Sequence, residues 1–203
     1  MLQTHTVESA LLELLIKLMQ QELFFPFTLV GGTALALQTG HRKSIDIDMF
    51  GNQPVDEISF TDILNEVGKV RVLSKSNNIL IYTINGIKVD FVNYRYNWLE
   101  KPLTLQSVRL ASKKDIAAMK LNAIAGRGSR KDFFDLHELL NYFSLEDILD
   151  FYDKKYPDGS KFMAIKSLTY FDDADREQNP ELIKSTTWGV IKKKIIKEVK
   201  NLI

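Results

Sequence analysis

The sequence predicts an α+β fold, in which a mixed β-sheet flanked by helices is followed by a C-terminal helical bundle. Up to about residue 100, helix-like and strand-like segments alternate along the chain, and they include a clear β-hairpin. After about residue 109 the pattern is helical only. Because no flexible linker separates the two patterns, we place a domain boundary at residue 110, between an α/β domain (1–110) and a helical domain (111–203).

The composition is that of a folded protein, with 45% hydrophobic and 26% charged residues among 203. The net charge of +1 means that a polyanion would need a local basic patch. The absence of cysteine excludes disulfides and thiolate metal sites and agrees with a reducing compartment. The first 25 residues lack the features of a signal peptide, and their charges interrupt the apolar run before membrane-spanning length. We therefore expect a cytoplasmic protein without membrane association.

An amphipathic helix is predicted over residues 7–23, because leucines recur there at intervals of three and four residues. The next apolar run, 27–30, is short and leads directly into Gly31 and Gly32. This pattern is typical of a buried strand that enters a turn.

Three further elements follow the glycines. A short helix over 33–39 ends at Gly40, and the period-2 alternation of SIDIDMF, 44–50, predicts a strand. On that strand the side chains expected to face the core are Ile45, Ile47 and Met49. A helix is predicted over 54–68, with an inward face made of Ile58, Ile63, Leu64 and Val67.

The hairpin lies in residues 78–94. Asn85 and Gly86 join two β-rich runs and are the dipeptide that a type I′ turn prefers. Alternation on the second strand places Ile87, Val89 and Phe91 on one face and Lys88, Asp90 and Val92 on the other.

The C-terminal half contains five predicted helices, over 113–128, 130–143, 144–156, 160–171 and 188–203. Ser112 and Asp115 have the spacing of a capping box at the start of the first, and Ser144 caps the third. Residues 172–180 are predicted to form an acidic loop.

The two aspartates in SIDIDMF pose a chemical question, because they put negative charge into an otherwise apolar strand. Asp46 and Asp48 are two residues apart, so their side chains share one face of a strand. Carboxylates in this arrangement suit Mg²⁺, which prefers oxygen ligands. Asp90, on the hairpin strand, is the candidate for the third carboxylate of a two-metal phosphoryl-transfer site.

Gly31 and Gly32 are candidates for the phosphate-binding part of such a site. A Gly-Gly turn before a helix lets backbone N–H groups and the positive helix end approach a triphosphate. Thr33 can add a hydroxyl, and Arg42 or Lys43 a positive charge. A phosphate cradle beside carboxylate metal ligands predicts nucleotidyl transfer.

Each feature alone has a structural explanation. Two glycines are common in turns, and Asp46 and Asp48 alone are compatible with a solvent-facing strand edge. The order of the elements is more specific: strand, Gly-Gly, helix, Asp-x-Asp strand, then a third aspartate in a hairpin.

The combined motifs resemble the AbiEii-type toxin branch of the DNA-polymerase-β-like nucleotidyltransferases. Residues 29–50 are similar to the family signature, and 84–94 resemble its third-carboxylate strand. Residues 109–136 resemble its helical motif, and the resemblance weakens after about residue 145.

The resemblance implies a nucleotidyltransferase sheet and a helical bundle that closes over the nucleotide. Its implied metal ligands, also catalytic, are Asp46, Asp48 and Asp90, the last being alternatively the base. Its implied nucleotide-binding residues are Gly31, Gly32, Thr33, Arg42, Ser44, Lys120, Lys131 and Asp135. Lys120 and Asp132 are further implied catalytic residues, although the polar face around them alone is typical of ordinary ion pairs.

The function implied is transfer of NMP from an NTP to RNA, with tRNA the first candidate, dependent on Mg²⁺ or Mn²⁺. The protein would then be the toxin of a bacterial toxin–antitoxin or phage-defence system, with a cognate antitoxin. One alternative keeps the fold and changes the acceptor to a protein hydroxyl or an aminoglycoside-like small molecule. Another is a nucleotide- or partner-binding module without turnover, against which the three carboxylates argue.

Three remaining features allow two interpretations each. The lysines of 192–194 suit RNA phosphates or a solvated helix face. Tyr94, Tyr96 and Trp98 suit stacking on a base or packing between the two halves, and His41 suits a phosphate contact or, preferably, a structural role.

Overall fold

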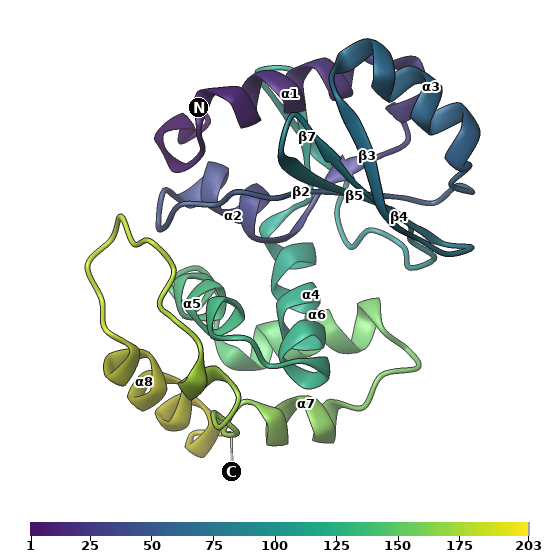
Figure 1. Cartoon of the computed structure of the whole chain (residues 1–203). Coiled ribbons are helices and arrows are strands. Elements are labelled where there is room, and N and C mark those ends of the chain that lie inside the picture. The colour runs from purple at the N-terminus through teal and green to yellow at the C-terminus, as the bar shows by residue number, and fades with distance from the viewer. Residues whose placement is uncertain (203) are drawn as a thin grey trace.

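A mixed β-sheet forms the centre of the N-terminal half (Figure 1). This computed structural model describes residues 1–202. Its strands are β1 (Thr28–Leu29), β2 (Ile47–Gly51), β3 (Val70–Lys75), β4 (Ile79–Ile84), β5 (Ile87–Asn93), β6 (Leu103–Leu105) and β7 (Val108–Leu110). Their spatial order is β3-β4-β5-β2-β1-β7-β6, with the β2–β5 and β1–β7 pairs parallel and the other pairs antiparallel.

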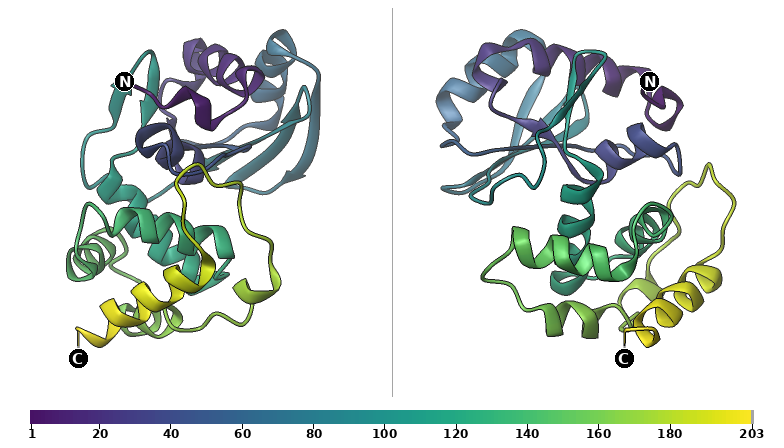
Figure 2. Two further views of the ribbon diagram at one scale, coloured as in Figure 1. Left: turned by 90° about the vertical axis from the view of Figure 1, so that its left-hand side faces the viewer. Right: turned by 180° about the vertical axis from the view of Figure 1, so that it is seen from behind.

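Helices cover the sheet on one side and form a bundle on the other, as the views in Figures 1 and 2 show. The α-helices are α1 (Ser9–Gln20), α2 (Gly31–Thr39), α3 (Glu57–Val67), α4 (Lys113–Gly126), α5 (Arg130–Leu139), α6 (Leu145–Lys155), α7 (Lys161–Ser167) and α8 (Trp188–Lys200). Short 3₁₀ turns occur at Thr4–Thr6, Glu22–Phe24 and Ala174–Arg176. In Figure 1, α1 and α3 lie above the sheet and α4 to α8 lie below it. No helix within residues 1–202 is both long and apolar enough to span a membrane.

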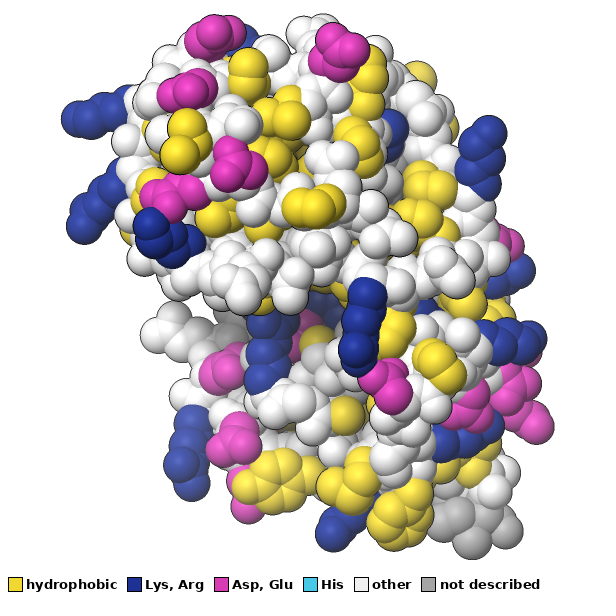
Figure 3. Space-filling view, turned by 90° about the vertical axis from the view of Figure 1, so that its right-hand side faces the viewer, with side chains coloured by type: hydrophobic (Ala, Val, Ile, Leu, Met, Phe, Trp, Pro, Cys, Tyr) yellow, Lys and Arg dark blue, Asp and Glu magenta, His cyan; other side chains and the backbone are white. Residues whose placement is uncertain are grey.

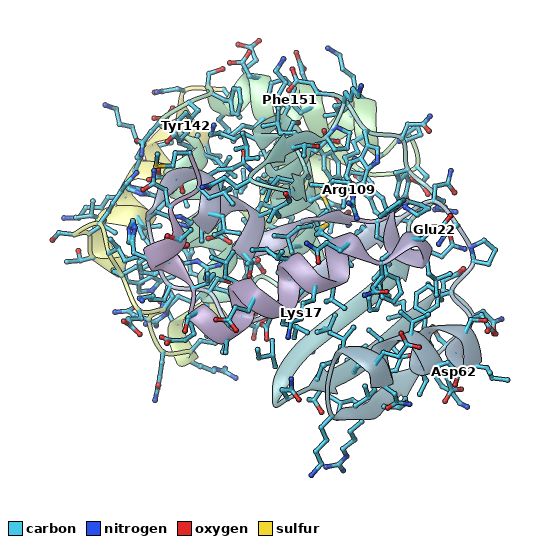
Figure 4. All side chains as sticks on the ribbon, turned by 90° about the horizontal axis from the view of Figure 1, so that it is seen from above. Lys17, Glu22, Asp62, Arg109, Tyr142 and Phe151 are labelled. Carbon is cyan, nitrogen blue, oxygen red and sulfur yellow. The ribbon has the colours of Figure 1, made fainter. Side chains whose placement is uncertain are left out.

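The core above the sheet is strongly aromatic. Phe24, Phe27, Phe60 and Phe91 pack together with ring centroids 4.7–6.5 Å apart, mostly edge to face. Arg109, labelled in Figure 4, donates to three backbone carbonyls at the end of α1 and in the segment after it. This core fixes the positions of β1 and β7. It thereby fixes the turn that connects β1 to α2.

The predicted fold class is confirmed, and most predicted elements are present within a few residues of their expected bounds. Asn85 and Gly86 both have positive φ, as the type I′ turn requires. Three strands escaped prediction: β3, β6 and β7. β6 and β7 have three residues each, too few for alternation to be recognised.

Two inward-facing predictions are wrong. Ile45 is 72% exposed, because β2 pairs with β5 only from Ile47 onward and the preceding residues form a separate loop. Ile58 is 73% exposed, because Phe60 and Leu64 form the buried stripe of α3. Ile58 is two positions before Phe60 and therefore lies on the opposite side of the helix.

A buried ion pair joins the segment after β5 to the helical half. Asp115 accepts hydrogen bonds from the backbone N–H groups of Leu99 and Glu100 and from Lys155 Nζ at 2.7 Å. Lys155 also lies over the rings of Tyr94 and Trp98. Of the two interpretations of Trp98, the structure therefore supports packing between the two halves. The predicted capping box is half formed. The Ser112 hydroxyl accepts a hydrogen bond from Asp115 N, but the Asp115 carboxylate binds Lys155 and the backbone after β5 instead of the backbone N–H of Ser112.

The chain between Glu177 and Thr187, which we call the strap, returns from the helical half to the segment after α2. It is the loop that reaches up toward α2 in Figures 1 and 2. Lys43 N donates to the carbonyl of Glu181, and Arg42 forms a β-bridge with Leu182. One hydrophobic core extends through both halves, and the division into two domains stays a prediction.

Candidate active site

The turn between β1 and α2 is built on glycine for two separate reasons. Gly31 has φ +69°, a conformation that L side chains rarely adopt. A Cβ on Gly31 would also lie 2.5 Å from Asp48 Oδ2, and one on Gly32 would lie 2.2 Å from an Arg42 guanidinium nitrogen. The glycines therefore let the start of α2 pack directly against a carboxylate and a guanidinium.

Gly31→Ala is expected to destabilise the protein by about 1–2 kcal/mol through its left-handed conformation and to abolish activity by displacing Asp48. Gly86→Ala is the matched control, because Gly86 also has positive φ but has no atom within 4 Å of an added Cβ. Both unfolding free energies should fall, and that of Gly31→Ala should fall further, because its Cβ must also displace the Asp48 carboxylate. Full activity in Gly31→Ala would contradict the close approach of the Asp48 carboxylate.

A cavity of about 370 Å³ opens beside these glycines; we call it the first cavity. Its cationic lining residues are Arg42, Lys43, Lys120, Arg127 and Lys131, and its acidic ones are Asp46, Asp48 and Glu181. The size lies in the range of small-molecule sites. Cations outnumber carboxylates on the lining itself, because two carboxylates that pair with them, Asp132 and Asp135, lie behind it; this surface favours an anionic ligand.

The three predicted carboxylates lie close enough to influence one another. Asp48 and Asp90 are direct neighbours in the parallel register of β2 and β5, and Asp46 comes just before β2. Burial raises the pKa of Asp48 to about 6, and the negative charges of Asp90 and Asp46 add to this effect. An added cation would relieve this repulsion.

A lysine stands beside each outer carboxylate. Lys131 Nζ lies 3.8 Å from Asp46 Oδ2, and Lys88 Nζ lies 2.6 Å from Asp90 Oδ2. The other oxygen of Asp90, Oδ1, is buried without a hydrogen-bond partner. Within residues 1–202 no three acidic or histidine side chains are arranged to hold a metal ion, so the metal-ligand role of the trio stays a prediction.

Lys120 comes from α4 and is held between two carboxylates of α5. Its Nζ lies 2.8 Å from Asp132 Oδ1 and 2.6 Å from Asp135 Oδ2, and it is only 5% exposed. Asp135 also receives Arg42 in a two-point contact, at 2.7 and 2.9 Å. Asp132 also accepts from Arg127 Nε at 3.0 Å.

Both aspartates of α5 are fully buried and lie behind the cations. Burial alone would raise the pKa of Asp132, but Lys120 and Arg127 lower it to about 2. Arg42 and Lys120 likewise overcome the effect of burial and hold the pKa of Asp135 well below its usual range. Asp132 and Asp135 are therefore positioned to orient the cations.

The two predicted hydroxyl groups support the loop before β2. Thr33 Oγ1 donates to the carbonyl of Asp46 and lies 2.8 Å from Ser44 Oγ. Ser44 lines the first cavity, whereas Thr33 is buried behind it. Contact of either hydroxyl with phosphate stays a prediction.

The structure adds residues that the motifs did not assign. Arg127 lines the first cavity, as do Pro180 and Glu181 of the strap. Lys43, predicted as an alternative to Arg42 for a positive charge, lines it as well. His41 is bonded to Asp135 Oδ1 at 2.8 Å and to Thr39 Oγ1 at 2.8 Å, which is the structural role preferred from the sequence. Arg127 can be recognised in the sequence as a basic residue of the helical motif. No local sequence pattern predicts that the strap folds back to the cavity.

A second cavity, of about 450 Å³, shares Gly31, Asp48, Lys120 and Arg127 with the first. It lies between β4, β5 and α4, and Asp90 belongs to its lining. Figure 3 shows a recess between the two halves of the molecule, with basic and acidic side chains beside it. Asp48 thus stands where the two cavities meet.

Comparison with known proteins identifies the family. The family model described as "Nucleotidyl transferase AbiEii toxin, Type IV TA system" matches residues 13–201. The chain belongs to this family. It is accordingly a transferase, and the alternative of a binding module without turnover is set aside.

The chain is also similar to individual proteins. It is 41% identical over 157 residues to "Uncharacterized protein aq_aa25" of Aquifex aeolicus (strain VF5), covering 74% of this chain and 76% of that one. MenT4, the nucleotidyltransferase toxin Rv2826c from Mycobacterium tuberculosis H37Rv, has a similar structure, with a TM-score of 0.63, 16% identity and 94% and 80% coverage. The antibiotic-resistance factor ANT(2'')-Ia gives a TM-score of 0.55 at 15% identity, with 71% and 90% coverage. These two likenesses show a shared fold.

Proposed function

We propose that this AbiEii-family protein transfers NMP from an NTP to an RNA acceptor, with tRNA the first candidate, using Mg²⁺ or Mn²⁺. It would act as the toxin of a toxin–antitoxin or phage-defence system, restrained by a cognate antitoxin. The observation that carries the proposal is the first cavity, whose lining brings cations together with Asp48, Lys120 and the Gly31 turn.

The first cavity supplies the groups needed to hold a triphosphate. The backbone at the start of α2 offers N–H groups and the positive helix end, and Lys120 and Arg127 add charge that is already oriented by Asp132. Fixed cations of this kind stabilise the charge that develops on leaving pyrophosphate without reorganising during the reaction. Lys131 would leave Asp46 and turn toward phosphate.

The donor chemistry of the three carboxylates suits a divalent cation, and their side chains would have to draw together to hold one. Asp46, Asp48 and Asp90 provide oxygen ligands, and the raised pKa of Asp48 reflects burial and repulsion between like charges. A divalent ion held there would neutralise charge on the α-phosphate and on the leaving pyrophosphate.

The transfer step balances with the groups on this chain. The acceptor oxygen forms a bond to the α-phosphorus, the bond from that phosphorus to the pyrophosphate oxygen breaks, and the hydroxyl proton passes to the carboxylate of Asp90. Asp90 Oδ1 is free of other partners and adjoins Asp48 across the strand pair. Pyrophosphate leaves through the first cavity.

Lys88→Met is expected to lower the Kd for Mn²⁺ about 3- to 10-fold, because it removes an ammonium group that competes for Asp90 at 2.6 Å. Mn²⁺ binding, followed by electron paramagnetic resonance, measures this without turnover. Lys75→Met, on β3, breaks a surface pair with Glu57 of α3; it is the control and should leave the Kd unchanged. Unchanged Mn²⁺ binding in Lys88→Met would count against Asp90 as a ligand.

The acceptor is tested by incubating the protein with labelled NTP, Mg²⁺ and either total RNA or RNase-treated lysate. Label in small RNA is the expected result. Label in protein or in an added aminoglycoside would replace the RNA acceptor by the corresponding alternative. Binding of NTP without transfer to any of these would contradict the proposal.

A further inference from the structure

The second cavity has no role in holding the triphosphate, although it shares Asp48 with the first. In an in-line displacement the attacking and leaving oxygens stand on opposite sides of the phosphorus. If pyrophosphate leaves into the first cavity, the attacking hydroxyl must come from the opposite side of the α-phosphorus. The second cavity adjoins the first at Asp48 and also contains Asp90, so it is the space that can supply this approach.

We propose that the second cavity binds the terminal nucleoside of the acceptor, with its sugar hydroxyl at Asp90 Oδ1. This inference rests on the proposed function. It makes the first cavity the donor side of the reaction and the second cavity the acceptor side.

The charge of the second cavity supports a nucleoside rather than a polycation. Its lining contains two carboxylates, Asp48 and Asp90, and two cations, Lys120 and Arg127, so the opposite charges balance. A polycationic sugar would be recognised by an excess of carboxylates, and a second triphosphate by an excess of cations.

The walls of the cavity suit a flat ring. Apolar side chains of the sheet face apolar positions of α4 across the cavity; they are Phe50, Ile79, Ile81 and Val92 on one side and Met119 and Ala123 on the other. Nucleobases have apolar faces and polar edges, and they bind by stacking on such surfaces. The volume of about 450 Å³ is within the range of small-molecule sites.

Polar groups stand where the edge of a base can meet them. Tyr94 and Tyr156 belong to the lining, and their hydroxyl groups share a hydrogen bond of 2.8 Å. Asn122 contributes a carboxamide from α4, which can both donate and accept. Arg127, whose side chain is 61% exposed, can reach the phosphate that precedes the terminal nucleoside.

Gly126 gives a sharp test, because it lines the second cavity but not the first, and an added Cβ there meets no atom within 4 Å. Gly126→Phe should fill the cavity while the fold is kept. Gly189→Phe is the matched control, since Gly189 is a helical glycine on α8 with equally open space. The measurements are NTP binding at equilibrium and the KM and kcat for the RNA acceptor.

The expected result for Gly126→Phe is a loss of kcat/KM for RNA of at least about 10-fold, with unchanged NTP binding. Gly189→Phe should match the wild-type protein in both. Loss of NTP binding in Gly126→Phe would overturn the inference, because the cavity would then hold the donor nucleoside. Unchanged transfer would overturn it as well.

Failure of this inference and failure of the proposed function give different results. If wild-type protein transfers label to RNA and Gly126→Phe does so equally well, only the acceptor site is wrong. If wild-type protein labels a protein or an aminoglycoside in place of RNA, both are wrong.

Discussion

Asp48→Asn is expected to reduce nucleotidyl transfer by at least about 1,000-fold while the protein remains folded. Asp48 is the carboxylate common to both cavities, and it touches the glycine turn at which α2 begins. An amide of the same shape keeps the packing but cannot supply the negative charge that a divalent ion requires. Initial rates with labelled NTP and RNA measure the loss.

The same substitution should stabilise the fold at neutral and alkaline pH. The folded protein raises the pKa of Asp48 from 3.8 to about 6, so the stability associated with this group is present below pH 3.8 and is lost as the pH rises through about 6. A shift of this size corresponds to about 2–3 kcal/mol. The introduced amide does not titrate, so the variant should gain this amount over wild type as the pH is raised from about 4 to about 8.

Two comparisons make the result specific. Asp46→Asn should lose transfer to a similar degree, because Asp46 lies in the first cavity with Asp48. Asp62→Asn, on the exposed surface of α3 and labelled in Figure 4, should retain both activity and stability. Retained turnover in both Asp46→Asn and Asp48→Asn would falsify the carboxylate mechanism.

The local chemistry of the site was readable from the sequence because it is carried by short-range patterns. The glycine pair, the Asp-x-Asp alternation and the Asn85-Gly86 turn each act within a few residues, and the structure places Gly31 against Asp48 and pairs Asp48 with Asp90. The same short motifs predicted the family and the nucleotidyltransferase fold, and both predictions are confirmed.

Features that depend on distant contacts could not be predicted. The strap carries Glu181 to the first cavity through backbone hydrogen bonds to residues about 140 positions earlier, and no local sequence pattern predicts these contacts. Ile45 was misplaced because strand pairing stops at Ile47, which alternation alone does not reveal. The sequence also does not reveal that Asp132 and Asp135 are buried and contact Lys120, Arg42 and Arg127; their direct roles in catalysis and nucleotide binding stay predictions.

The buried contacts of Asp135 predict a large effect on stability. Asp135→Asn should lower the free energy of unfolding by about 3–5 kcal/mol, because it leaves buried cations without their carboxylate. Arg42, Lys120 and His41 all contact Asp135, and each of these side chains is at least 90% buried. Asp158→Asn, which breaks the exposed pair with Arg95, is the control and should change little. Denaturant unfolding measures both.

The pH dependence separates this explanation from simple loss of packing. The pKa of Asp135 is held well below 3.8 in the folded protein, so its stabilising contribution is present above pH 3.8 and is lost as the pH falls through the lower folded-state value. Wild-type protein should therefore lose stability on acidification more steeply than Asp135→Asn, and the two curves should converge at low pH. A constant difference between them down to acidic pH would show that the ion pairs are not the source. Because Lys120 also lines both cavities, Asp135→Asn should weaken NTP binding even where it remains folded.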